Sequence, residues 1–151
     1  MIKYTQTNLS PGNCWQTCIA SILEVDPSQL PDQATIEANG RHASADYTNA
    51  LGSYLRKHHG LIYIQIPCWH VAGSLTLSGF HVITGETVRT PENNRQHAIV
   101  GLDGKWCWDP HPSRKFLTKM VRYGILVPRS NVPGIEDLYA DECICPRCKE
   151  M

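Results

Sequence analysis

Cys14 stands where a loop containing Pro11 and Gly12 changes into a helical pattern. Asn13 occupies the N-cap position, where its side-chain oxygen can accept a hydrogen bond from a first-turn N–H. The positive end of a helix dipole favours an anion, and therefore favours the thiolate form of a cysteine at the first helical position. We therefore predict that Cys14 is a nucleophile, whereas Cys18, one turn further on, is expected to be a small core residue.

A histidine and a carboxylate that complete this chemistry lie at the outer ends of a predicted hairpin. His97 opens one strand and Asp109 ends the next, and the Asp-Gly pair at 103–104 is a strong hairpin signal. In an antiparallel pair the start of one strand lies beside the end of the other, so the two side chains are expected to meet. The carboxylate can hold the imidazole in one tautomer while the imidazole takes the proton of Cys14. These three residues predict a catalytic triad.

The predicted reaction also needs donors for an oxyanion, because a thiolate that attacks a carbonyl carbon places negative charge on the oxygen. The backbone N–H of Cys14 is one donor. The side-chain amide of Gln6 is the first choice for the second, and Asn8 is the alternative. His81, on another predicted strand, is the competing base, and it ranks second because it has no such carboxylate on a partnered hairpin strand.

Three neighbours of the predicted triad are candidates for contacting substrate, namely Trp15, Asn13 and His111. Trp15 directly follows the nucleophile and is equally consistent with ordinary core packing. His111 closely follows the predicted aspartate and also fits a structural role in a loop.

The elements that must position these residues follow from the spacing of apolar residues. Helical periodicity predicts one helix over 14–24, which Pro27 ends, and a second over 46–57. Residues 26–44 are polar and typical of turns. β-Branched runs predict strands over 61–66, 79–84, 97–102, 105–109 and 121–127. Helices followed by antiparallel strands predict an α+β domain in which the nucleophile helix packs on an antiparallel sheet.

The strand that ends at Asp109 carries two tryptophans. Trp106 and Trp108 alternate with Cys107, so simple alternation places both rings on one face. Asp109 is then expected on the face of Cys107.

Composition sets the broad class of the protein. A chain of 151 residues is long enough for one domain with a real core, which we place at 1–140, followed by a cysteine-rich tail over 141–151. The formal charge is zero and there is no basic block, so neither nucleic acid nor a membrane is expected as a partner. The sequence shows neither a signal-peptide pattern nor an apolar run of the ~20 residues that a membrane helix needs. We expect a cytoplasmic protein.

Seven cysteines, an odd number without an export signal, argue against a disulfide framework. Near the end of the chain, Cys143, Cys145 and Cys148 include a C-x2-C pair of the kind that zinc uses. Cys68, His70 or a second chain would have to supply the fourth ligand. Free thiols and a redox-active dithiol are the alternatives. Catalysis by the predicted triad requires no cofactor, so zinc here would be structural.

The segments 12–14 and 18–23 together resemble the nucleophile helix of papain-like, C39-like cysteine peptidases, especially small bacterial and phage-encoded ones. Residues 97–101 and 108–113 resemble the histidine and aspartate strands of that group. The resemblance implies a papain-like fold and a cytoplasmic setting in a bacterium or a phage-infected cell.

The same resemblance implies a role for each matching residue. Cys14 would be the nucleophile, His97 the general base and Asp109 its orienting partner. Gln6 would correspond to the upstream glutamine of the family, although its distance along the chain from Cys14 is longer than the family leads us to expect.

The sequence therefore predicts a cysteine hydrolase that cleaves a peptide or isopeptide amide through a thioester on Cys14. The partner would be a protein or peptide substrate, and the sequence leaves the oligomeric state open. One alternative is an acyltransferase or transglutaminase-like enzyme with the same triad. The other is a catalytically inactive protein that uses a papain-like cleft for binding.

Overall fold

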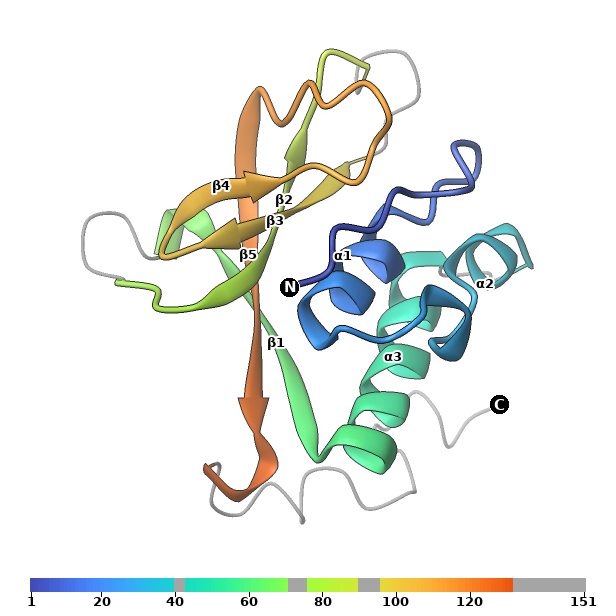
Figure 1. The fold of residues 1–151 in the computed structure, drawn as a ribbon, viewed down its shortest axis with the longest axis vertical. Helices are drawn as coiled ribbons and strands as arrows, with labels where there is room; N and C mark the ends of the chain where they lie inside the picture. Colours follow the sequence, from blue (N-terminus) through green and yellow to red (C-terminus); the bar gives the residue numbers. More distant parts are fainter. Residues whose placement is uncertain (40–42, 71–75, 90–95, 132–151) are drawn as a thin grey trace, which may run out of the picture.

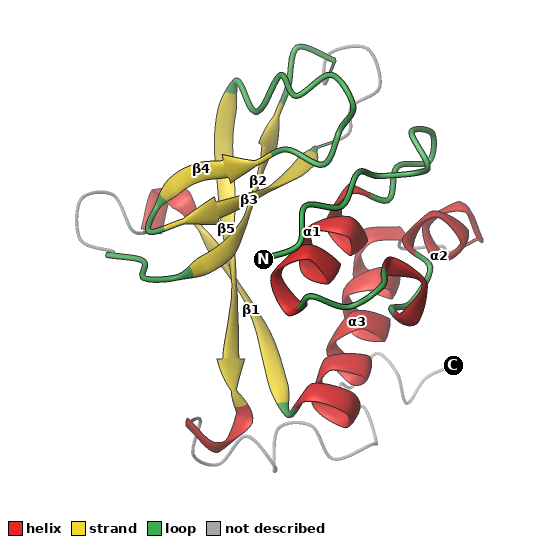
Figure 2. Cartoon of the chain, in the orientation of Figure 1, coloured by secondary structure: helices red, strands yellow, loops and turns green. Residues whose placement is uncertain are grey.

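The computed structural model describes residues 1–39, 43–70, 76–89 and 96–131. Within them the chain is α+β, as predicted, with helices gathered on one side of an antiparallel sheet (Figures 1 and 2). The helices are α1 (Cys14–Leu23), α2 (Gln33–Asn39) and α3 (Ala43–His59). Short 3-10 turns cover Pro27–Gln29, Cys68–His70 and Arg129–Asn131. No helix among the described residues is both long and apolar enough to cross a membrane.

In the described part of the chain the sheet contains five strands in the order β1-β5-β2-β3-β4, and each neighbouring pair is antiparallel. The strands are β1 (Leu61–Pro67), β2 (Phe80–Glu86), β3 (His97–Leu102), β4 (Lys105–Trp108) and β5 (Lys119–Pro128). All five predicted strands are confirmed, with ends that differ by at most two residues. The longest, β5, lies between β1 and β2 and so joins the two parts of the sheet (Figure 1).

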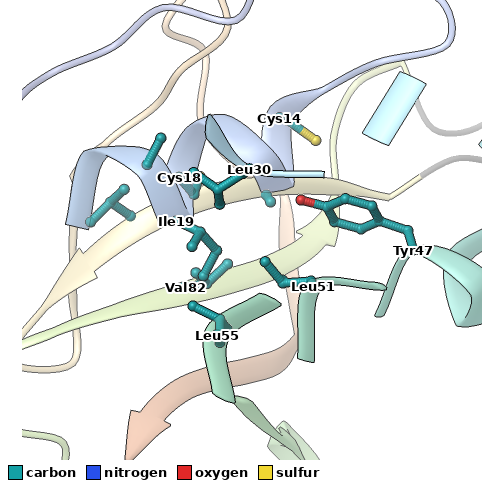
Figure 3. Packing of buried hydrophobic residues seen from close by; sticks show 11 residues of the cluster. Cys14, Cys18, Ile19, Leu30, Tyr47, Leu51, Leu55 and Val82 are labelled. Carbon is teal, nitrogen blue, oxygen red and sulfur yellow. The ribbon is translucent and has the colours of Figure 1, made fainter. Parts of the chain in front are cut away.

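Helix α1 supplies the centre of the core. Cys18 and Ile19 are fully buried and face Leu51 and Leu55 of α3 across the core shown in Figure 3. Val82 of β2 closes the same cluster from the sheet. Burial raises the pKa of the Cys18 thiol well above its ordinary value, which agrees with the predicted role as a small core residue.

The hairpin of β3 and β4 turns at Asp103 and Gly104, which both have positive φ angles of 51° and 76°. This conformation matches the strand twist and is the reason for the Asp-Gly preference that predicted the turn. The Asp103 carboxylate also accepts a hydrogen bond from the backbone N–H of Gly79, at 2.7 Å, and so ties the turn to the start of β2.

The predicted common face for the two tryptophans of β4 is wrong. The register changes so that Val100 pairs with Trp108 but Gly101 pairs with Trp106, which leaves Cys107 as the extra residue of a bulge. Trp108 packs against the main core cluster, whereas Trp106 stacks on Phe116, which packs on the second cluster at the other face of the sheet. The bulge therefore shifts the alternation immediately before Asp109.

Part of the segment 26–44, predicted as turns, is helical. Helix α2 follows Asp32, whose side chain accepts hydrogen bonds from the backbone N–H of Thr35 at 3.2 Å and from its hydroxyl at 2.8 Å. Aspartate is a preferred residue at the start of a helix, so Asp32 could have predicted this element.

Candidate active site

His97 and Asp109 meet at the open end of the β3–β4 hairpin, as the turn geometry predicted. Nε2 of His97 lies 2.7 Å from Oδ1 of Asp109, and the two residues are only 6% and 1% exposed. Oδ1 also accepts the backbone N–H of His111 and Oδ2 accepts that of Phe116, each at 2.8 Å. Burial favours the protonated form of Asp109, but these hydrogen bonds outweigh it and lower the pKa of the carboxyl. Asp109 is therefore an ionised carboxylate fixed by three hydrogen bonds, and it fixes the orientation of the His97 ring.

Cys14 is the first residue of α1, as predicted, and its side chain lies close enough to His97 to help raise the pKa of the imidazole. Because Nε2 of His97 faces Asp109, Nδ1 is the ring nitrogen that remains for the sulfur. Burial lowers the pKa of His97, but the hydrogen bond to Asp109, the neighbouring Cys14 side chain and the charges of both more than offset it and raise the pKa to about 9. An imidazole with this pKa is mainly protonated at neutral pH and can stabilise a thiolate beside it.

The side-chain cap predicted for Asn13 does not form. Its Oδ1 accepts the backbone N–H of Asn8 and its Nδ2 donates to the hydroxyl of Thr7, both at 3.1 Å. The loop that leads into Cys14 folds back on itself, and its hydrogen bonds use the side-chain amide of Asn13, which is therefore not available to cap α1. Asn13 is buried and does not line the cleft described below, whereas Trp15 and His111 do.

Gln33 of α2 performs the capping instead. Its Oε1 accepts the backbone N–H groups of Trp15 and Gln16, each at 3.0 Å. This cap does not use the N–H of Cys14, the group predicted to face an oxyanion. Sequence reasoning missed Gln33 because the two helices approach each other only in the folded chain.

Gln6 is only 6% exposed and lines the same cleft as Cys14. Its backbone N–H donates to the carbonyl of Pro110 at 3.0 Å, and its side-chain Nε2 donates to the carbonyl of Asn8 at 3.0 Å. An amide nitrogen carries two hydrogens, so one is left for an oxyanion. Asn8, the alternative, is exposed and does not line the cleft.

The cleft has a volume of about 1080 Å³ and lies between the sheet, the N-terminal parts of α1 and α3, and helix α2. Most of its lining residues carry an amide, hydroxyl or charged group, and Cys14 and His97 are in the lining. Trp15 forms part of the wall, and its Nε1 donates to the hydroxyl of Tyr63 at 2.7 Å.

His111 stands beside the predicted base, with its ring edge-on to that of His97 at 5.9 Å between centroids. Burial, together with the charges of Arg89 and His97, lowers the pKa of His111. Nη1 of Arg89 lies 2.9 Å and 2.6 Å from the two ring nitrogens of His111. His111 therefore lies between the Arg89 guanidinium and the imidazole of His97.

His81, the competing base, does not line the cleft. It is buried on β2, with Nδ1 3.1 Å from the carbonyl of Gly79 and its ring edge-on to Tyr123. A Cβ on Gly101 would lie 2.3 Å from its Nε2, so the ring packs directly on the neighbouring strand. Its place is structural.

The predicted zinc ligands Cys143, Cys145 and Cys148 lie outside the described residues. Within those residues, no group of three or more histidine, cysteine, aspartate or glutamate side chains is arranged to hold a metal ion. Cys68 and Cys107 are partly exposed free thiols.

Comparison of the chain with models of known protein families, with curated proteins and with solved structures finds no match.

Proposed function

We propose that the protein is a papain-like cysteine hydrolase that cleaves peptide or isopeptide amide bonds through a thioester on Cys14. The observation that carries this proposal is the position of His97, which is held 2.7 Å from the Asp109 carboxylate and lines the same large cleft as Cys14, near enough for the thiol to raise the pKa of the imidazole. A volume of about 1080 Å³ exceeds what a small metabolite needs and suits a segment of polypeptide.

In the proposed reaction, the Cys14 thiolate attacks the amide carbonyl carbon and the carbonyl oxygen becomes an oxyanion. The backbone N–H of Cys14 and the free N–H of the Gln6 amide stabilise that charge. As the oxyanion collapses, the C–N bond breaks and protonated His97 gives its proton to the leaving amine.

The second half returns the enzyme to its starting state. Neutral His97 takes a proton from water, and the hydroxide adds to the thioester carbonyl. Collapse of this second intermediate releases a carboxylic acid and the Cys14 thiolate beside an imidazolium. Asp109 keeps the ring oriented throughout because its carboxylate remains bound to Nε2.

The test uses the other thiols of the chain as internal references. Cys14 is only 9% exposed, whereas Cys68 and Cys107 are partly exposed. Exposure alone predicts that iodoacetamide labels Cys68 and Cys107 first. The proposed activation predicts that Cys14 is labelled first at mildly acidic pH, as read by mass spectrometry of peptides.

Two variants complete this test. His97→Asn should abolish the preference for Cys14, whereas the Cys14→Ala protein should retain its fold and fail to react with a peptide vinyl-sulfone probe. Labelling in the order of exposure, or a preference for Cys14 that survives His97→Asn, would overturn the proposed function.

A further inference from the structure

Two arginines line the cleft on the side of His97. Arg89 reaches His111, whose ring lies against that of His97. Arg122 of β5 donates from Nη1 to Oε1 of Gln96 at 3.2 Å, and Gln96 directly precedes His97. Separate strands and loops thus bring both guanidinium groups to the same side of the site.

Among the described residues, neither arginine has an ion-pair partner. Glu37 is the one acidic residue in the described lining of the cleft, and it lies on α2, where it accepts a hydrogen bond from Gln33 at 2.8 Å. The His97 side therefore carries two arginines without a carboxylate partner among the described residues, whereas the charge of the His97 imidazole is balanced by the Asp109 carboxylate.

A buried polar atom lies next to these charges. Thr84 of β2 pairs directly with Arg122 of β5, so both side chains point to the same face of the sheet. Thr84 lines the cleft and its hydroxyl oxygen is buried, with no hydrogen-bond partner among the described residues. A buried hydroxyl normally has a partner, so a polar ligand group is expected here.

The chemistry of the proposed reaction says which part of a substrate meets this region. His97 must protonate the leaving amine, so the leaving portion lies beside the imidazole. We propose that Arg89 and Arg122 form an anion-binding subsite on the leaving-group side, and that the substrate carries a carboxylate there. A planar guanidinium matches a carboxylate in geometry and charge. This proposal rests on the proposed function.

The experiment compares two alkylating reagents of nearly equal size, neutral iodoacetamide and anionic iodoacetate. The quantity measured is the ratio of iodoacetate to iodoacetamide labelling rates at Cys14, divided by the same ratio at Cys68. In the wild-type protein we expect a value well above one. In Arg122→Gln we expect it to fall about fivefold, the effect of losing one partly exposed charge contact.

Two variants distinguish direct binding of the anion by Arg122 from a general effect of positive charge on the labelling rate. Lys119→Gln removes one positive charge from the same strand, but Lys119 is exposed, pairs with Glu86 and does not line the cleft. It should leave the ratio unchanged, and Arg122→Lys should largely retain it. A value near one in the wild-type protein, or an equal fall in Lys119→Gln, would overturn the subsite. If Cys14 is slow with both reagents, it is the proposed function that fails.

Two peptides distinguish the source of the carboxylate by protecting Cys14 from iodoacetamide. Acetyl-Gly-Glu-Gly-amide offers an acidic side chain, and acetyl-Gly-Gln-Gly with a free C-terminus offers a terminal carboxylate. Stronger protection by one of them identifies the source. Protection no better than that of neutral acetyl-Gly-Gln-Gly-amide, by either peptide, would contradict the subsite.

Discussion

Gln16 and Gln33 exchange hydrogen bonds across the interface between α1 and α2. Gln16 N–H donates to Oε1 of Gln33 at 3.0 Å, and Gln33 N–H donates to Oε1 of Gln16 at 3.1 Å. Both residues are buried. The start of the helix that carries Cys14 is therefore fixed by a partner in the next helix, not by its own N-cap residue.

This exchange predicts the effect of Gln33→Ala. Loss of the acceptor leaves two first-turn N–H groups without their partner, so the free energy of unfolding should fall by about 1–2 kcal/mol. Urea denaturation measures the change. Glu37→Gln is the matched control, because it alters the far end of the Gln33 amide and leaves the cap in place. An equal loss in both variants would contradict the capping role.

The raised pKa of His97 predicts how stability depends on pH. A group whose pKa rises from 6.5 to about 9 on folding stabilises the protein fully below pH 6.5, and this contribution is lost as pH rises through about 9. Its upper limit is about 3 kcal/mol. The difference in unfolding free energy between the wild type and His97→Gln should therefore shrink between pH 7 and 10. Urea denaturation at several pH values measures this difference, and a difference that stays constant over that range would contradict the raised pKa.

Asp109→Asn should slow the iodoacetamide labelling of Cys14 by roughly tenfold or more. The neutral amide no longer stabilises the imidazolium, and its single oxygen cannot accept all three hydrogen bonds that the carboxylate receives. Mass spectrometry follows the labelling rate. Asp103→Asn, in the hairpin turn, is the control and should label at the wild-type rate. If Asp109→Asn does so too, the carboxylate has no part in activation.

Gly124→Ala should destabilise the protein by about 1–3 kcal/mol. A Cβ at this position would lie 1.9 Å from the hydroxyl of Tyr63, which also accepts the hydrogen bond of Trp15. The tyrosine must move, and the wall of the cleft moves with it. The change in melting temperature measures the effect, and tryptophan fluorescence reports on Trp15.

Gly52→Ala is the matched control for that substitution. Gly52 lies inside α3, and its added Cβ would meet only the end of the flexible Arg56 side chain, at 3.3 Å. Alanine favours a helix interior, so this variant should be neutral or up to about 1 kcal/mol more stable. A similar loss in both variants would show that crowding against Tyr63 is not the cause.

The meeting of His97 and Asp109 was predictable from the sequence because it depends on local chemistry. An Asp-Gly turn sets the register, and the register places the two side chains together. The helix that begins at Cys14 was likewise predictable from periodicity alone.

Features that depend on packing between distant segments were not predictable in this way. The amide of Gln33 reaches α1 only in the folded chain, and Arg122 meets the cleft only because β5 inserts between β1 and β2. The bulge at Cys107 was missed for a different reason, because alternation assumes that no residue is inserted in the strand.

That inserted residue has a consequence for the beginning of the chain. Because Cys107 shifts the phase of β4 by one position, the indole of Trp108 turns inward, and its Nε1 binds the carbonyl of Tyr4 at 2.9 Å. Two residues later, Gln6 binds Pro110 through the backbone. The bulge thus fixes the amino-terminal segment to the end of β4, directly before Asp109. The Gln6 amide and the Asp109 carboxylate are therefore positioned by the same set of contacts, and a change in the bulge would displace both.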